Sequence, residues 1–90
     1  MTPIYTDSQV KTFANLIARE VDNCEVNDSF TVLFGDTEAI VYYSADVEEF
    51  EDGGWRPYNE KVEVQDFICS DDFTDEQIYD LQDKLNFLLN

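Results

Sequence analysis

The stretch "SFTVLFGDTEAIVYYSADV", residues 29–47, decides the fold because its first half places apolar residues at every second position. Phe30, Val32 and Phe34 fall on one face of an extended chain, since successive side chains of a β-strand point to opposite faces. Residue types typical of turns stand on both sides of this run. The run that follows is rich in β-branched and aromatic residues, and it predicts a longer strand from about Glu38 to Val47.

A third strand is predicted further along the chain, at "KVEVQDFI", residues 61–68, where valines alternate with charged and polar residues. The sequence "EDGG", residues 51–54, separates it from the second strand and predicts a turn, because both glycines can adopt positive φ without steric cost. Pro57 has no N–H to donate to a ladder. Residues 55–59 are therefore expected to form a bulge, an edge segment or part of a wide loop.

Helices are predicted at both ends of the chain, and they begin with the same capping pattern. In "YTDSQV" Thr6 is the cap and Gln9 stands three residues later; in "FTDEQI" Thr74 and Gln77 repeat the arrangement. Apolar residues then recur at helical spacing. In the first helix these are Val10, Phe13, Ala14, Ile17 and Val21, and in the second they are Ile78, Leu81, Leu85 and Leu88.

The element order is therefore α-β-β-β-α, which indicates an α+β fold. A three-stranded antiparallel meander with two helices packed on one face is the simplest arrangement, because the helical stripes need an apolar partner and the inner face of the sheet is the only large one. Residues 1–90 are expected to form a single compact domain. An aromatic content of 14% supplies the core that acidic disordered chains lack.

The formal net charge of −16 argues against direct binding to nucleic acid or to anionic membranes, since those surfaces attract basic proteins. The chain has no apolar run long enough to span a bilayer, and its first residues do not resemble a signal peptide. A cytoplasmic protein, monomeric or dimeric, is expected. Cys24 and Cys69 either form a disulfide or remain two buried thiols, and the second reading is favoured in a reducing cytosol.

Catalytic patterns are missing from the sequence. The chain contains no His, its serines lack the glycines of a hydrolase elbow, and its three glycines do not form a phosphate-binding loop. We expect no enzyme activity, no cofactor and no dedicated metal site. A looser calcium site near Asp52 or Asp71-Asp72 is a weaker alternative, because the best alignment to a helix–loop–helix calcium loop places Phe50 and Asn59 at ligand positions.

Acidic residues are concentrated in the middle of the chain. No Lys or Arg occurs from Glu20 to Trp55, whereas eleven acids do. One interpretation is a purely solubilising surface, as in proteins of salt-rich cytoplasm. The other is imitation of nucleic acid, because alternate residues of a strand stand about 6.6 Å apart, near the spacing of successive phosphates. Asp46 and Glu48 would form such a row, and Glu76, Asp80 and Asp83 of the last helix would add a second.

Aromatic residues beside the acidic turn would make such a contact specific. Phe50, Trp55 and Tyr58 are the candidates, with a small core under the hairpin as the alternative. The predicted partner-binding residues are Asp36, Glu38, Asp46, Glu48, Glu49, Glu51, Asp52, Trp55 and Tyr58. The expected partner is a basic, nucleic-acid-binding protein.

In size, acidity and lack of catalytic motifs, the whole chain resembles the class of small phage-encoded inhibitors that includes DNA-mimic anti-restriction and anti-CRISPR proteins. The resemblance implies a non-enzymatic inhibitor that occupies a nucleic-acid-binding site on a host enzyme, in the host cytoplasm. It also implies that the partner is a nuclease or a CRISPR or restriction effector. Immunity-type inhibitors of basic nucleases are similar in size and physics. The remaining alternatives are a small adaptor or structural protein whose acids only confer solubility, and a small cation-binding domain.

Overall fold

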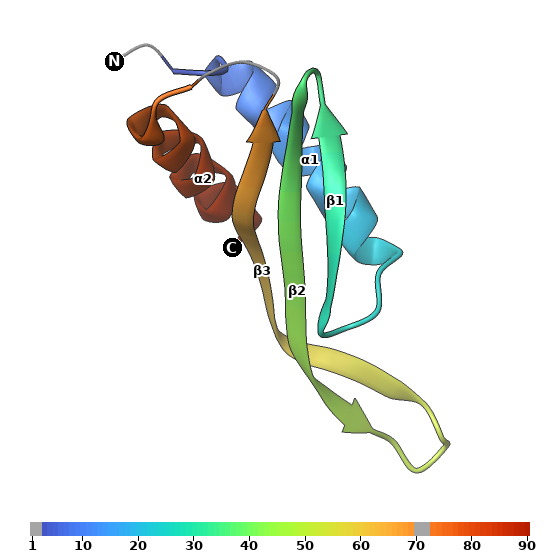
Figure 1. Cartoon of the computed structure of the whole chain (residues 1–90). Helices are drawn as coiled ribbons and strands as arrows, with labels where there is room; N and C mark the ends of the chain where they lie inside the picture. The colour runs from blue at the N-terminus through green and yellow to red at the C-terminus, as the bar shows by residue number, and fades with distance from the viewer. Residues whose placement is uncertain (1–2, 70–72) are drawn as a thin grey trace.

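The computed structural model describes residues 3–69 and 73–90, apart from the side chain of Cys69. Within them, two helices and three strands follow in the order α1 (Asp7–Asp22), β1 (Asp28–Phe34), β2 (Thr37–Glu49), β3 (Trp55–Cys69) and α2 (Asp75–Leu89). The strands form one antiparallel sheet in the order β1-β2-β3 (Figure 1). The α+β meander predicted from the sequence is confirmed.

The second and third strands are longer than predicted. β2 continues to Glu49, and β3 already begins at Trp55, so Pro57 lies inside a strand, opposite Val47. Proline is tolerated here because only two strands are present at this level and each has a free edge. The register between β2 and β3 shifts between Ser44 and Asp46, and Asn59 beside this shift has a φ of 51°. The expected bulge and edge segment therefore occur together.

The turns follow the residues that permit them. Gly35 in the β1–β2 turn has a φ of 59°, and Gly53 at the tip of the β2–β3 hairpin has a φ of 84°. Gly54, for which the sequence also allowed positive φ, does not adopt it. It instead donates its N–H to the side chain of Asp52 at 2.9 Å, which closes the turn locally.

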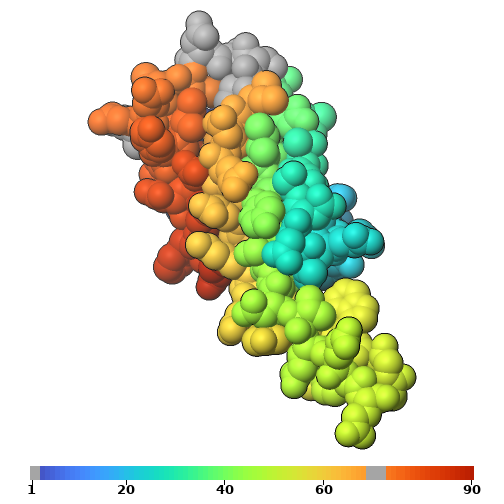
Figure 2. All heavy atoms as spheres, turned by 60° about the horizontal axis from the view of Figure 1, so that its bottom comes forward, coloured from blue at the N-terminus to red at the C-terminus, as the bar shows by residue number. Residues whose placement is uncertain are grey.

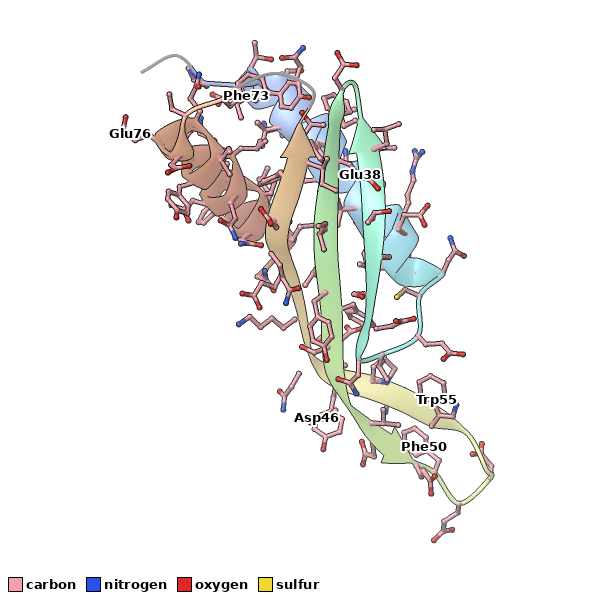
Figure 3. The ribbon with its side chains drawn as sticks, viewed as in Figure 1. Glu38, Asp46, Phe50, Trp55, Phe73 and Glu76 are labelled. Atoms are coloured by element: carbon pink, nitrogen blue, oxygen red, sulfur yellow. The ribbon has the colours of Figure 1, made fainter. Side chains whose placement is uncertain are left out.

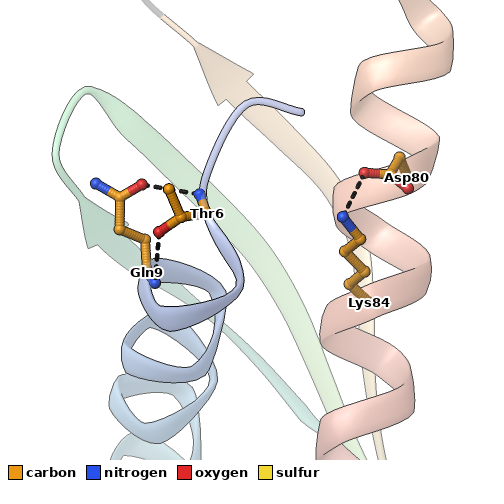
Figure 4. Close-up of polar contacts among 4 residues, drawn as sticks. All are labelled: Thr6, Gln9, Asp80 and Lys84. Atoms are coloured by element: carbon orange, nitrogen blue, oxygen red, sulfur yellow. Dashed lines mark hydrogen bonds and ion pairs between the residues drawn. The ribbon is translucent and has the colours of Figure 1, made fainter. Parts of the chain in front are cut away.

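Both predicted helix caps are present. The hydroxyl of Thr6 accepts the N–H of Gln9 at 3.2 Å, and the Gln9 side chain accepts the N–H of Thr6 at 2.9 Å (Figure 4). Thr74 and Gln77 form the same pair of bonds at 3.3 and 3.0 Å. These reciprocal bonds satisfy backbone donors that the first turn of a helix leaves without partners.

The core lies between α1, α2 and the inner face of the sheet. The buried apolar residues are Val10, Phe13, Ala14, Ile17, Val32, Ala39, Val41, Tyr43, Val62, Val64, Phe67, Leu81 and Leu85. The predicted stripe of the last helix is only partly buried, because Ile78 is half-buried and Leu88 is 44% exposed. α2 packs beside β3, so only part of its apolar face reaches the core.

A row of amide side chains from α2 covers the edge of β3. Asn86 Oδ1 accepts the N–H of Val64 at 2.7 Å, and Asn90 Oδ1 accepts the N–H of Val62 at 3.2 Å. Gln82 Nε2 donates to the carbonyl of Val64 at 2.8 Å, and Asn90 Nδ2 donates to that of Val62 at 2.7 Å. Gln82, Asn86 and Asn90 follow at intervals of four residues and therefore share one helix face. They replace the fourth strand that β3 does not have.

Candidate partner-binding surface: the acidic hairpin arm

β2 and β3 continue past the end of β1 as a two-stranded extension, residues 45–60, which we call the arm (Figure 1). The pairing of β1 with β2 ends at the pair of Asp28 with Tyr43. Beyond this pair the arm projects from the body of the molecule (Figure 2). The whole molecule, arm included, has a longest dimension of 53 Å. No buried core residue of the described chain belongs to the arm. The arm is therefore a surface feature that the core does not require.

The arm concentrates negative charge. Its acids are Asp46, Glu48, Glu49, Glu51, Asp52 and Glu60, and its one base is Arg56. Asp46 pairs across the ladder with Tyr58, and Glu48 pairs with Arg56, so the two acids share a face as the sequence predicted. Directly opposite charges on one face of a sheet attract, and Arg56 therefore offsets part of the row. Sequence reasoning missed this pairing, because the register depends on the bulge.

Large apolar side chains of the arm are exposed. Trp55 is 58% exposed, Tyr58 47% and Phe50 40%. Figure 3 shows Trp55 and Phe50 on the arm. They do not form the small core under the hairpin that was the alternative prediction. The Arg56 guanidinium lies over the Phe50 ring at 4.9 Å from its centroid, and this cation–π contact orients the ring at the tip.

The alternation of the ladder places apolar and acidic residues on both faces of the arm. Trp55 lies opposite Glu49, on one face, and Tyr58 lies opposite Asp46, on the other. The amide of Asn59 donates to the Asp46 carboxylate at 3.2 Å. Each face thus offers an aromatic ring next to a carboxylate, which is the composition expected of a contact anchored by aromatics and steered by charge.

Two of the predicted site residues lie outside the arm. Asp36 stands in the β1–β2 turn, and Glu38 follows at the start of β2, at the opposite end of the molecule (Figure 3). Glu38 and Asp46 are eight positions apart, which corresponds to about 26 Å of strand. The structure brings together the other seven predicted residues, which all belong to the arm.

The second predicted acidic row, on α2, is also distant from the arm. Asp80 forms an ion pair with Lys84 at 3.0 Å, one helical turn later (Figure 4). Glu76 lies at the start of α2, at the end of the molecule away from the arm (Figure 3). The two rows therefore do not form one continuous acidic surface.

A buried tyrosine joins the arm to the body. The Tyr43 hydroxyl donates a hydrogen bond to the Glu60 carboxylate, and Tyr43 is only 3% exposed. Burial, together with the hydrogen bond to Glu60 and the negative charge of Glu60, raises the pKa of Tyr43 to about 12. No sequence pattern indicates this pair, because the two residues meet only through the register of β2 and β3.

Stability is expected to depend on Tyr43 at high pH. Because its pKa is about 10 in the unfolded chain and about 12 in the fold, the neutral hydroxyl stabilises the protein below pH 10, and this contribution is lost as pH rises toward 12. Between pH 9 and pH 11, the free energy of unfolding measured in urea should fall by about 1.4 kcal/mol more for the native protein than for Tyr43→Phe. Parallel losses in both proteins would contradict a buried, proton-holding Tyr43.

Cys24 is a free, half-buried cysteine. Burial raises the pKa of its thiol, and the nearby carboxylates of Asp28, Glu25 and Glu20 act in the same direction. A raised thiol pKa lowers the share of reactive thiolate at neutral pH. The predicted choice between a disulfide and two thiols also depends on the side chain of Cys69, which lies outside the described part of the structure.

Within residues 3–69 and 73–90, no three His, Cys, Asp or Glu side chains are grouped so that they could hold a metal ion. Asp71 and Asp72, named in the calcium alternative, lie outside the described residues.

Neither α1 nor α2, the helices of the described part, is long and apolar enough to cross a membrane. No protein-family model, curated protein or solved structure matches the chain.

Proposed function

We propose that this protein is a non-enzymatic inhibitor that inserts its arm into the basic nucleic-acid-binding groove of another protein. The observation that supports this function is the arm itself, which combines six acids with exposed Trp55 and Tyr58 and contains none of the buried core residues of the described chain. A surface that exposes aromatic rings to solvent and concentrates like charge is typical of an interaction site. The proposed binding surface is the arm alone, without Asp36 and Glu38.

The geometry of the arm suits a groove that accommodates a nucleic-acid strand. Its two chains are about 4.8 Å apart, as in any β-ribbon, so the arm is slender. Carboxylates at about 6.6 Å intervals on each strand would meet Lys and Arg side chains that ordinarily contact phosphates. Trp55 and Tyr58, on opposite faces, would fill apolar or stacking pockets that otherwise receive bases. Association would be fast and steered by charge.

This function places the protein in the cytoplasm together with its target, in an infected or toxin-producing cell. The class of DNA-mimic phage inhibitors and the class of nuclease immunity proteins both use acidic surfaces in this way, and either assignment satisfies the proposal. The identity of the captured target separates them, because the first class meets a defence enzyme and the second a toxin nuclease.

Affinity capture from host lysate tests the proposal with three baits. They are the native protein, the charge-neutralised variant D46N/E48Q/E49Q/E51Q/D52N, and the charge-retaining variant W55A/Y58A. At low salt we expect only the native bait to recover a basic nucleic-acid-binding protein. Capture by the native bait should be lost at high salt, because exposed charges are screened beyond about 3 Å at 1 M ionic strength. Added duplex DNA or RNA should release the captured protein.

The competing adaptor function predicts a different pattern. The exposed aromatic rings favour it, since an apolar contact needs no complementary charge. If this protein is an adaptor, the native and neutralised baits would capture its partner equally at both salt concentrations. The capture would resist competition by nucleic acid and would be lost only with the W55A/Y58A bait. That pattern would contradict mimicry and reduce the acids to a solubilising role.

A further inference from the structure

The two edges of the sheet differ in whether other parts of the chain form hydrogen bonds with them. The edge of β3 is hydrogen-bonded to Gln82, Asn86 and Asn90, as described above. β1 forms the other edge, and none of the described strands pairs with its outer side; the C-terminal part of α1 lies behind β1 and reaches past this edge (Figure 1). An uncovered edge strand presents a row of backbone donors and acceptors that can pair with another strand.

The open side of β1 is defined by the alternation of its backbone groups. In an antiparallel ladder, hydrogen-bonded pairs alternate with non-hydrogen-bonded pairs, and the pair that closes a two-residue turn is hydrogen-bonded. Phe34 and Thr37 close the β1–β2 turn. Ser29, Thr31 and Leu33 therefore direct their N–H and C=O groups away from β2. The N–H of Ser29 accordingly finds an acceptor in the Asp28 side chain at 2.9 Å.

Most of β1 lacks the usual devices that protect an edge strand, and its one charged residue, Asp28, stands at its first position. Residues 29–34 contain no charge, Pro or Gly, although the chain as a whole carries 26 charged residues among 90. The register of β1 with β2 runs from Asp28 to Phe34 without a bulge. Leu33 on the outer face is 67% exposed. Long, regular, uncharged edges are the ones that pair with other strands.

We propose that β1 is a self-association edge, and that a second copy of this chain pairs with it in antiparallel orientation about a twofold axis at Thr31. Thr31 is both the midpoint of Asp28–Phe34 and one of the outward-facing residues. When the two copies of β1 pair along their whole length about this axis, the backbone groups directed away from β2 in one copy face those of the other. Thr31 then lies opposite its own copy, and Ser29 lies opposite Leu33 of the second copy. Two three-stranded sheets then form one continuous sheet with an isologous contact.

Charge favours this one orientation of two strongly acidic chains. The twofold axis sends the two arms to opposite ends of the dimer, which separates the largest concentrations of negative charge. A groove of about 380 Å³ between α1 and β1 lies next to the axis, lined by Leu16, Arg19, Glu20, Thr31, Val32 and Leu33. The charges of Arg19 and Glu20 in this lining cancel, so the groove beside the axis has no net charge. Self-association should accordingly strengthen with salt, whereas target binding by the arm should weaken.

Sedimentation velocity from micromolar to millimolar protein, at 0.1 M and 1 M NaCl, tests this edge with Thr31→Pro and Thr31→Val as a matched pair. Proline removes an outward N–H that β2 does not use, so the monomer keeps its fold; valine keeps the N–H. We expect the native chain and Thr31→Val to dimerise with concentration, more tightly at 1 M salt, and Thr31→Pro to remain monomeric. A monomeric native chain at millimolar concentration in 1 M salt, or equal dimerisation of both variants, would overturn the proposal.

Hydrogen exchange on the native chain gives a readout that does not depend on the folding of a variant. The amides of Thr31 and Leu33 should become protected as protein concentration rises, while the amide of Val64 on the covered edge is protected throughout. Protection of Thr31 and Leu33 only when a captured target is added would overturn the second copy as occupant, in favour of a strand from the target. The arm variants leave β1 intact, so failure of either proposal is distinguishable from failure of the other.

Discussion

A chain in which an Asn-Gly turn replaces residues 45–60 is expected to keep its fold and to bind its target at least about 100-fold more weakly. Ser44 and Lys61 are direct partners in the ladder, so a two-residue turn can close the shortened hairpin at this pair. All buried core residues of the described chain lie outside the deleted segment. Loss of Trp55, Tyr58 and six acids removes every proposed anchor, and two aromatic hot spots alone correspond to such a loss.

Circular dichroism and urea unfolding check the folded half of this prediction. The lost hydrogen bond between Tyr43 and Glu60 should cost about 1 kcal/mol, with a cooperative transition retained. Binding is measured against the captured target, with D36N/E38Q as the matched control, because these acids lie at the other end of the molecule. Retained binding by the shortened chain, or loss of binding by the control, would move the interface away from the arm.

The local features of the fold could be predicted from the sequence. The Thr6–Gln9 and Thr74–Gln77 caps depend on residues three apart, and the alternation around Val32 depends on residues two apart, so a short window contains the whole signal. The covered β3 edge could not be predicted. Asn86 and Asn90 read as ordinary polar residues of an exposed helix face, because their partners Val64 and Val62 are more than twenty residues away.

The candidate site was predicted in part for the same reason. Acids close in sequence, from Asp46 to Asp52, remain close in the arm. Asp36 and Glu38 lie on the same hairpin but are separated from the arm by the length of a strand, a distance that counting residues at about 3.3 Å each could have revealed. The position of Arg56 opposite Glu48 required knowledge of the register, which the bulge near Asn59 shifts by one residue.

Truncation of the central core residue should have the largest effect on stability. Phe13 is fully buried, and its ring lies 5.1 Å from Phe34, 6.2 Å from Tyr5 and 6.4 Å from Phe67, measured between ring centroids. Phe13→Ala removes these aromatic contacts and leaves a cavity between α1 and the sheet, and such changes cost about 3–5 kcal/mol. Since small domains are stable by only about 5–15 kcal/mol, most of the stability would be lost.

Phe87→Ala is the matched control, because it deletes the same side chain from a helix position that is 84% exposed. It should change the free energy of unfolding by less than about 0.5 kcal/mol. Far-UV circular dichroism in urea is the appropriate measurement, since the single Trp55 is exposed on the arm and does not report on the core. Equal effects of the two variants would mean that Phe13 is not packed between α1 and the sheet. A large effect of Phe13→Ala alone would establish that the stability of the body depends on the packing of this ring.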